Sequence, residues 1–211
     1  MSKPRLALLF FGISYMERFN NRFGSVNSVD YRECLSSQRE MIYKYFTDLG
    51  YTIDIFLCTN PSSLQDQVVK DYKPVAFRFE NGCRGHKIKI VFDLVWDYSK
   101  ENNIEYDLIL LTRFDIKFMI PLAESNIKLD HLNIVSILEE PDLICDNFYL
   151  MPGCYLESFK AVSKKAGSHG HQLKAKLERL FNVNYMFDQH CVVANLKFYK
   201  IIRCPPKTET L

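Results

Sequence analysis

The sequence predicts an α/β protein with a mixed, mostly parallel central sheet of about six strands flanked by helices. Residues 108–112 form an apolar run bordered by acids, which is typical of a strand buried on both faces of a parallel sheet. Over residues 6–118, strand-like runs alternate with helical patterns, as in successive βαβ units. Residues 88–96 carry apolar side chains at helical spacing, as expected of a helix that covers a sheet.

Composition limits the class of protein further. The chain has 211 residues, of which 47% are hydrophobic and 25% are charged, which predicts an ordinary globular protein with one sizeable core. We expect a single domain over residues 1–204 and a tail or the start of a linker over residues 205–211, with further domains following it as one option. The formal net charge of +2, with Lys and Arg spread along the chain, argues against nucleic acid as the main partner.

The cysteines and the N-terminus bear on location. The seven cysteines are odd in number and form no CxxC pair, which argues against a zinc ribbon or a disulfide framework and predicts a cytoplasmic protein. Lys3 and Arg5 precede the apolar run 6–11 and imitate a signal peptide, but no A-x-A-like cleavage site follows, so a strand is preferred. No run approaches the roughly 18 apolar residues of a membrane span.

The first half of the chain begins with the strand at residues 6–11. Residues 12–30 are polar and too long for a simple connection, so we expect either a disordered segment or a ligand-binding loop at the strand end. A helix over residues 35–49 follows, and Gly50 ends it. The next expected elements are a strand at 52–58, a short helix toward Tyr72 and a strand at 75–79.

The second half continues the same alternation. The helix around residues 88–96 leads into the central strand that precedes Asp115. Beyond it the apolar pattern loosens before strands and helices return. The expected elements are strands at 132–138 and 146–151, helices around 156–162 and 173–181, and a last strand at 198–203.

Several common catalytic motifs are absent from the sequence. There is no G-x-G-x-x-G after a strand and no Gly-Lys-Ser/Thr, which argues against a Rossmann dehydrogenase and a P-loop kinase. There is also no G-x-S-x-G elbow for a hydrolase serine. The remaining candidates are carboxylates and histidines near the ends of strands.

Asp115 is the main candidate, because it comes directly after the central strand and ligands of open α/β sheets gather at the carboxyl ends of strands. A buried carboxylate is costly unless it is paired. One reading is therefore a salt bridge from Asp115 to Arg113 or Lys117. The other is a ligand site, since Arg113 and Asp115 lie two residues apart, face one side, and could together hold a divalent ion and the phosphates it bridges. Spacing alone leaves both readings open.

The histidines give weaker indications. His190 follows Asp188-Gln189 near a late strand, where a single histidine is either a hydrogen-bonded structural residue or a metal ligand. Arg84 and His86 precede the helix around residues 88–96 and could meet a phosphate at its free N–H groups, or lie in a solvated turn.

Three segments carry a resemblance to a known family. Residues 106–115 resemble a strand that ends in a D-x-D motif, with Arg113 in place of the first acid; residues 146–153 are similar to an N-x-G-type segment that passes beneath a sugar. Residues 188–195 resemble the D-Q-x-x-L-N segment of retaining enzymes. In this order and spacing, the chain resembles the nucleotide-sugar-dependent glycosyltransferases of the GT-A fold, and specifically the small glycosyltransferase domain of chlorella viruses.

The resemblance implies roles for individual residues. Asp115 would bind Mn²⁺ or Mg²⁺ on the donor diphosphate, and His190 would be the late metal ligand. Asp188 and Asp146 would be the catalytic carboxylates near the sugar, which stabilise an oxocarbenium-like state or act as base or nucleophile. The implied donor-binding residues are Phe11, Gly12, Ser14 and Tyr15 around the uracil and ribose, with Lys89, Arg113 and Gln189.

The implied function is that of a metal-dependent glycosyltransferase of the hexosyltransferase type. It would move a sugar from a UDP-sugar donor to a glycan or glycoprotein acceptor, and the D-Q resemblance implies retention. The expected location is the cytoplasm, or the host cytoplasm if the protein is viral. Two alternatives stay open: a metal-dependent nucleotidyltransferase, and a catalytically inactive nucleotide- or glycan-binding domain.

Overall fold

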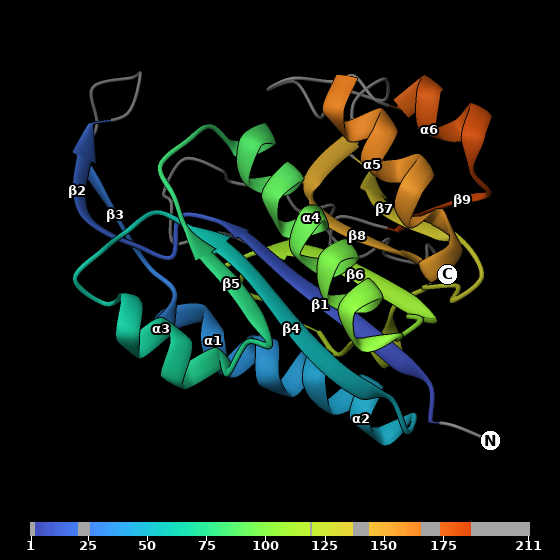
Figure 1. Cartoon of the computed structure of the whole chain (residues 1–211), viewed down its shortest axis with the longest axis horizontal. Helices are drawn as coiled ribbons and strands as arrows, with labels where there is room; N and C mark the ends of the chain where they lie inside the picture. Colours follow the sequence, from blue (N-terminus) through green and yellow to red (C-terminus); the bar gives the residue numbers. More distant parts are fainter. Residues whose placement is uncertain (1–2, 21–25, 119, 137–143, 166–173, 187–211) are drawn as a thin grey trace, which may run out of the picture.

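The computed structural model describes residues 3–20, 26–118, 120–136, 144–165 and 174–186 (Figure 1). Within these residues, seven strands form one central sheet in the order β5-β4-β1-β6-β8-β7-β9. The strands are β5 (Ala76–Phe79), β4 (Thr52–Thr59), β1 (Arg5–Gly12), β6 (Leu108–Arg113), β8 (Ile144–Pro152), β7 (Leu132–Ser136) and β9 (Val183–Met186).

The sheet is mixed and mostly parallel, as predicted, with seven described strands where about six were expected. Strands β5, β4, β1 and β6 are parallel, β8 runs antiparallel to both β6 and β7, and β9 is parallel to β7. In the middle of the sheet, Leu8 of β1 lies between Ile55 of β4 and Leu110 of β6. The unbroken apolar runs of β1 and β6 follow from this position, since both faces of these strands are covered.

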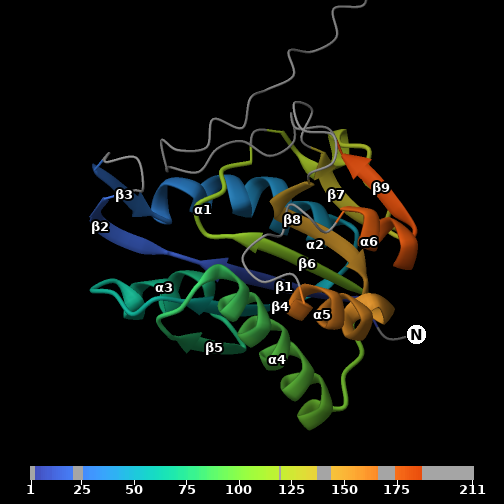
Figure 2. The same ribbon diagram turned by 90° about the horizontal axis from the view of Figure 1, so that it is seen from above.

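Helices cover the two faces of the sheet, and Figure 2 shows α1 and α2 on one side of β1 and β6 and α4 on the other. Alternate residues of β1 supply the two cores: Leu8 and Phe10 pack toward the first face, and Leu9 and Phe11 toward the second. On the first face lie α1 (Arg32–Gln38), the π-helical stretch η1 (Arg39–Tyr43), α2 (Lys44–Asp48) and α3 (Gln65–Tyr72); on the second lie α4 (Arg84–Asn102), α5 (Leu156–Lys165) and α6 (Lys174–Leu180).

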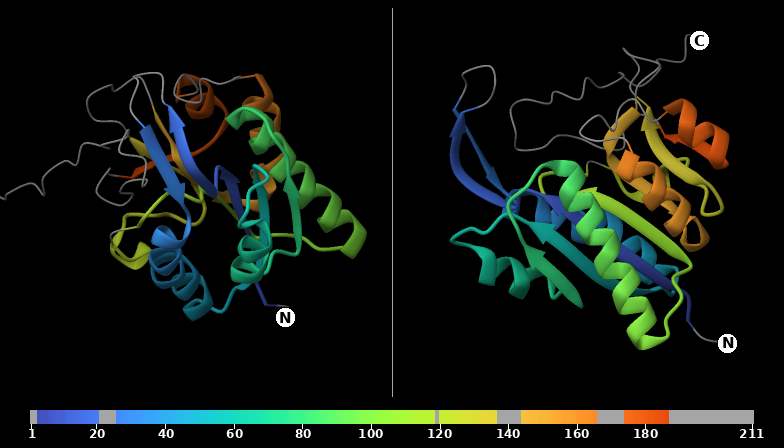
Figure 3. Two further views of the ribbon diagram at one scale, coloured as in Figure 1. Left: turned by 90° about the vertical axis from the view of Figure 1, so that its left-hand side faces the viewer. Right: turned by 45° about the horizontal axis from the view of Figure 1, so that its top comes forward.

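The polar segment after β1, expected as either a disordered segment or a ligand-binding loop, contains two paired strands. Part of it forms a hairpin of β2 (Tyr15–Asn20) and β3 (Val26–Asp30), which extends beyond the point where β1 ends (Figures 1 and 3). Tyr15 lies opposite Asp30, and the Tyr31 N–H closes the base of the hairpin by donating to the Ser14 carbonyl oxygen at 2.9 Å. The polar composition concealed these strands because cross-strand pairing, rather than burial of an apolar face, supports them.

Strand β9 was also not predicted. It pairs with β7, and its buried Asn184 donates to the side-chain oxygen of Asn133 and to the backbone oxygen of Asn126, both at 2.8 Å. Two buried asparagines that bond each other are uncommon in strands, which explains why the apolar pattern did not reveal this edge. The strand expected at residues 198–203 lies outside the described residues.

The other elements expected within the described residues are present with shifted ends, and α4 extends furthest beyond its predicted pattern. Short 3₁₀ turns occur at η2 (Leu122–Glu124) and η3 (Gly153–Tyr155). No helix in the described part of the chain is both long enough and apolar enough to cross a bilayer.

Gly153 follows the last residue of β8 and packs against the backbone that leads into β6. Its N–H donates to the Asp107 carbonyl oxygen at 2.8 Å, and a Cβ at this position would lie 1.7 Å from the Tyr106 carbonyl oxygen. The conflicting atom is backbone, so a side chain here requires the two strands to separate. The sequence needs glycine at this position because of close packing.

We therefore expect Gly153→Ala to lower the free energy of unfolding by about 2–4 kcal/mol, because the added methyl group overpacks a backbone contact. Gly50→Ala is the matched control: Gly50 has φ of 86° but no atom within 4 Å of an added Cβ. Its loss should be only about 1 kcal/mol, from backbone strain alone. Denaturant unfolding measures both, and equal losses would contradict the close approach at Gly153.

Candidate functional site

The candidate site lies at the edge of the sheet where β5, β4, β1 and β6 end, which we call the carboxyl edge. Gly12 pairs with Thr59 there, and Phe11 pairs with Arg113. Because β8 runs antiparallel to β6, the start of β8 near Asn147 reaches the same edge. Ligands of open α/β sheets bind at such an edge, so the fold brings the residues expected around Asp115 to a suitable place.

Asp115 and Arg113 form a buried ion pair at this edge. Asp115 is 1% exposed, and its Oδ1 and Oδ2 accept hydrogen bonds from Arg113 Nε at 2.8 Å and Nη2 at 2.5 Å. Arg113 Nη1 also donates to Asn147 Oδ1 at 3.2 Å. The two parallel N–H···O bonds are the bidentate arrangement that arginine makes with carboxylates. Of the two salt-bridge partners that the sequence left open, the structure has Arg113.

The turn that carries Asp115 is fixed by helix α1. Gln38 Nε2 donates to the carbonyl oxygens of Phe114 at 3.1 Å and Ile116 at 3.2 Å, and Gln38 Oε1 accepts from the Tyr72 hydroxyl at 2.8 Å. Burial raises the pKa of Tyr72 well above its ordinary value, so this hydroxyl remains a donor. A fully buried amide with its donors and acceptor satisfied is a rigid support for the turn.

Ser14 holds the end of β1 to the end of β4. Its N–H donates to Thr59 Oγ1 at 2.9 Å, and the Thr59 hydroxyl donates to Ser14 Oγ at 3.0 Å, with both residues fully buried. Gly12, with φ of 109°, makes the turn, and a Cβ there would lie 4.0 Å from Arg113 Cγ. Gly12 and Ser14 are thus part of the carboxyl edge, where the Ser14 hydroxyl is bonded to Thr59.

The remaining predicted donor-binding residues have other surroundings. Tyr15 starts the hairpin, where its hydroxyl donates to Glu17 at 3.2 Å and the Arg32 guanidinium lies 6.0 Å from its ring centre. The ring of Phe11 is enclosed in the core beneath α4 and presents no exposed face. Lys89 is half exposed on α4, with its Nζ 3.9 Å from Asp93.

Lys87 is a candidate that the sequence reasoning missed. It lies in the first turn of α4, is 3% exposed, and donates from Nζ to the Gly82 carbonyl oxygen at 2.7 Å. Burial lowers its pKa below the ordinary value of a lysine. The signal was its spacing, because Lys87 stands three and four residues before the buried Ile90 and Val91 and therefore on the inner side of the helix.

The first turn of α4 has features that attract an anion and one that opposes it. The turn itself contains no acidic residue, and Cys83 at its N-cap makes no side-chain cap. The Glu80 carboxylate, however, lies against this turn, with its Oε1 2.6 Å from His86 Nε2. Free N–H groups and the positive end of the helix dipole attract phosphate or carboxylate groups, and a lysine in the same turn adds a full charge. The carboxyl edge therefore combines this turn with the Arg113–Asp115 pair, although the Asp115 charge offsets that of Arg113.

The described residues do not fit a divalent metal as they are arranged. They contain no group of three or more His, Cys, Asp or Glu side chains that could hold an ion. Both oxygens of Asp115 are engaged by the Arg113 guanidinium. Asp188, Gln189 and His190 lie outside the described residues, as does the side chain of Asp146, whose backbone belongs to β8. Their predicted roles remain predictions.

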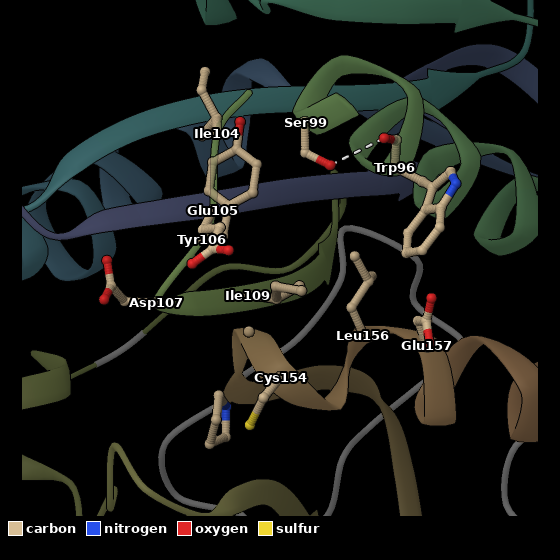
Figure 4. A pocket seen from close by; sticks show the side chains of 12 residues that line it. Trp96, Ser99, Ile104, Glu105, Tyr106, Asp107, Ile109, Cys154, Leu156 and Glu157 are labelled. Atoms are coloured by element: carbon tan, nitrogen blue, oxygen red, sulfur yellow. Dashed lines mark hydrogen bonds between the residues drawn. The ribbon is translucent and has the colours of Figure 1, made fainter. Parts of the chain in front are cut away.

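A cavity of about 540 Å³ lies at the opposite edge of the sheet, where β6 begins and β8 ends (Figure 4). In Figure 4, Trp96 and Leu156 approach it from α4 and α5, while Glu105 and Asp107 lie beside the chain that enters β6. The lining includes Gly153 and none of the residues expected to bind a donor. This cavity and the buried ion pair are thus at different ends of the strands.

Comparisons with known proteins give a likeness in structure. No family model and no curated protein matches the sequence. A mannosyltransferase from Pyrobaculum calidifontis, whose structure holds GDP-mannose and Mn²⁺, has a TM-score of 0.50 and 11% identity, over 92% of this chain and 57% of that one. This chain therefore spans little more than half of that protein.

Two further solved structures are similar at a lower level. One is a cytidylyltransferase from Leptospira borgpetersenii, with a TM-score of 0.48, 11% identity, and coverage of 86% of this chain and 75% of that chain. The other is a glycosyltransferase involved in glycosylation of the major capsid of PBCV-1, with a TM-score of 0.44, 10% identity, and coverage of 86% and 81%. The chain has a GT-A-like α/β fold. At these identities the likeness is one of fold, and the narrower viral resemblance remains a prediction.

The support given by Gln38 can be tested by Gln38→Leu. The substitution leaves two carbonyl oxygens and the Tyr72 hydroxyl without partners, so we expect a loss of about 2–3 kcal/mol in the free energy of unfolding. Gln67→Leu is the control, because Gln67 makes a single bond to Asp71 on the half-exposed side of α3. It should change stability by no more than about 0.5 kcal/mol. If Gln38→Leu is as stable as Gln67→Leu, the claim that Gln38 supports the turn with Asp115 is wrong.

Proposed function

We propose that this protein is a glycosyltransferase that binds a nucleotide-sugar donor at the carboxyl edge. The observation that carries the proposal is the buried Arg113–Asp115 pair at the end of the central strand, in contact with Asn147 from the neighbouring antiparallel strand. A buried ion pair is weak evidence for a stabilising role, because the desolvation of its two charges offsets their attraction, so its presence at a strand end supports a role in binding. The GT-A-like fold supports the same class of reaction without deciding it.

The donor diphosphate would lie between the first turn of α4 and the Arg113 side chain. In glycosyl transfer, negative charge builds on the leaving nucleoside diphosphate as the anomeric bond breaks. Lys87, the N–H groups of the first turn of α4 and Arg113 would stabilise this charge, and groups fixed in advance do so without reorganising. Lys87 is held in this turn by its bond to the Gly82 carbonyl oxygen. Lys87 would act as a point charge and Arg113 through its planar donors.

The nucleoside and the sugar would lie on opposite sides of the diphosphate. We place the base and ribose at the end of β1, around Gly12, Ser14 and Tyr15. Because the Ser14 hydroxyl is bonded to Thr59, Ser14 would contribute mainly its position in the turn. The sugar would face the start of β8 and the segment with Asp188 and Gln189, where Asp188 or Asp146 would stabilise positive charge at the anomeric carbon.

The finer assignment follows the sequence resemblance. We propose a UDP-sugar as donor, a glycan or glycoprotein as acceptor, and retention of configuration. The resemblance also implies Mn²⁺ or Mg²⁺, but an ion at Asp115 would have to displace Arg113 and take further ligands from outside the described residues. The binding-only alternative is favoured by one observation, the complete pairing of Asp115 in the ligand-free protein.

Calorimetry with UDP, GDP and CMP, followed by a screen of UDP-sugars for release of UDP, tests the proposal. We expect UDP to bind and at least one UDP-sugar to be hydrolysed slowly or transferred. Binding without turnover of any sugar nucleotide would instead favour the binding-only alternative. The proposed function is contradicted if no uridine or guanosine nucleotide binds, with or without Mn²⁺.

Two lysines of α4 give a residue-level prediction. Lys87→Met should weaken nucleoside diphosphate binding about tenfold or more, since it removes a charge beside the diphosphate. The control is Lys44→Met. Lys44 lies on α2 and pairs with Asp48 on the surface, so its substitution should leave the affinity for the nucleoside diphosphate unchanged. If Lys89→Met causes the loss and Lys87→Met does not, the predicted role of Lys89 is correct and that of Lys87 is wrong.

A further inference from the structure

A guanidinium occupies the place at Asp115 where the resemblance implies a divalent ion. Carboxylates bind Mg²⁺ or Mn²⁺ through one or both oxygens, and here both oxygens accept hydrogen bonds from Arg113. The third contact, from Arg113 Nη1 to Asn147, fixes the plane of the guanidinium. An ion at Asp115 would have to displace this cation or lie against it.

Displacement is costly because the pair is enclosed. The side chains of Asp115 and Arg113 are 2% and 14% exposed, and the neighbouring Phe114 and Ile116 are fully buried. Gln38 holds the carbonyl oxygens on both sides of Asp115, so the turn cannot easily carry the carboxylate outward. Turning Arg113 away would break its two hydrogen bonds to the Asp115 carboxylate and its bond to Asn147, so an ion would have to replace all three contacts inside an enclosed site.

The local charge leads to the same conclusion. Two acids with one divalent ion sum to zero, and one arginine with one aspartate also sums to zero. Adding a divalent ion to the Arg113–Asp115 pair would instead leave two positive charges in excess, in a place where water is largely excluded. The Arg113–Asp115 pair is therefore neutral without an ion.

We propose that Arg113 takes the place of the divalent ion at this edge, and that the protein binds a nucleoside diphosphate there without a metal at Asp115. Asp115 is then a positioning residue that holds the guanidinium toward the ligand. The diphosphate part rests on the proposed function above, whereas the statement about the metal stands without it.

Binding of Mn²⁺ by the ligand-free protein, followed by electron paramagnetic resonance, tests the metal part directly. We expect the wild type and Asp115→Asn to bind Mn²⁺ alike, within about twofold. Asp54→Asn is the matched control, because Asp54 is also enclosed and pairs with an arginine, Arg5, at the other edge of the sheet. Wild-type binding that falls about tenfold or more in Asp115→Asn, and not in the control, overturns the proposal.

A gain of metal binding provides the converse test. Arg113→Asp places two carboxylates on one side of the chain, and we expect it to bind Mn²⁺ about tenfold or more tightly than the wild type. Its thermal midpoint should also rise with Mn²⁺ and fall again with EDTA. If this variant does not fold, the comparison of wild type with Asp115→Asn still decides the question.

Titration of the wild type with UDP and with GDP, in EDTA and in Mn²⁺, tests the diphosphate part. Affinity should agree within about twofold between the two conditions and fall about tenfold in Arg113→Lys, which keeps the charge but loses the bidentate fork. A tenfold or so loss of wild-type affinity in EDTA overturns the proposal. Absence of binding in both conditions contradicts the proposed function and with it the diphosphate part, while the Mn²⁺ experiment still decides whether Arg113 replaces the ion.

Discussion

A carboxylate buried at the end of the central strand must have a cation beside it, and this requirement organises the carboxyl edge. Asp115 follows β6, which lies between β1 and β8 in the middle of the sheet. Arg113 supplies the cation from the last residue of the same strand, so the pair forms within one short segment. The cost of burying either charge alone means that any ligand at this edge must be accommodated around the pair.

The pair depends on elements distant in the sequence. Gln38 reaches the turn from α1 on one face of the sheet, and Asn147 reaches Arg113 from β8. Tyr72 of α3 in turn holds Gln38. A preorganised charge of this kind suits an edge where charge develops during a reaction, because the groups need not move to meet it. The same rigidity disfavours exchange of the arginine for an ion.

The two edges of the sheet have different chemistry. The carboxyl edge has buried charges and the first turn of α4, whereas the opposite edge has a cavity lined by Trp96, Leu156 and neighbouring acids. The likeness to solved structures supports the fold, and the sugar-transfer proposal rests on the residues at the carboxyl edge. The proposed donor site is therefore based on the positions of charged side chains and not on this cavity.

The sequence by itself determined the mixed, mostly parallel sheet and the position of Asp115 after a buried strand, because continuous apolar runs and helical spacing are local patterns. It missed the β2–β3 hairpin and β9, which are stabilised by pairing and by asparagine hydrogen bonds rather than by an apolar pattern. Only the tertiary structure decided that Asp115 pairs with Arg113 rather than Lys117, and that Gln38 of α1 and Asn147 of β8 hold this pair in place. The contacts of Gln38 and Asn147 join elements far apart in the chain, and sequence spacing cannot fix distances between separate elements.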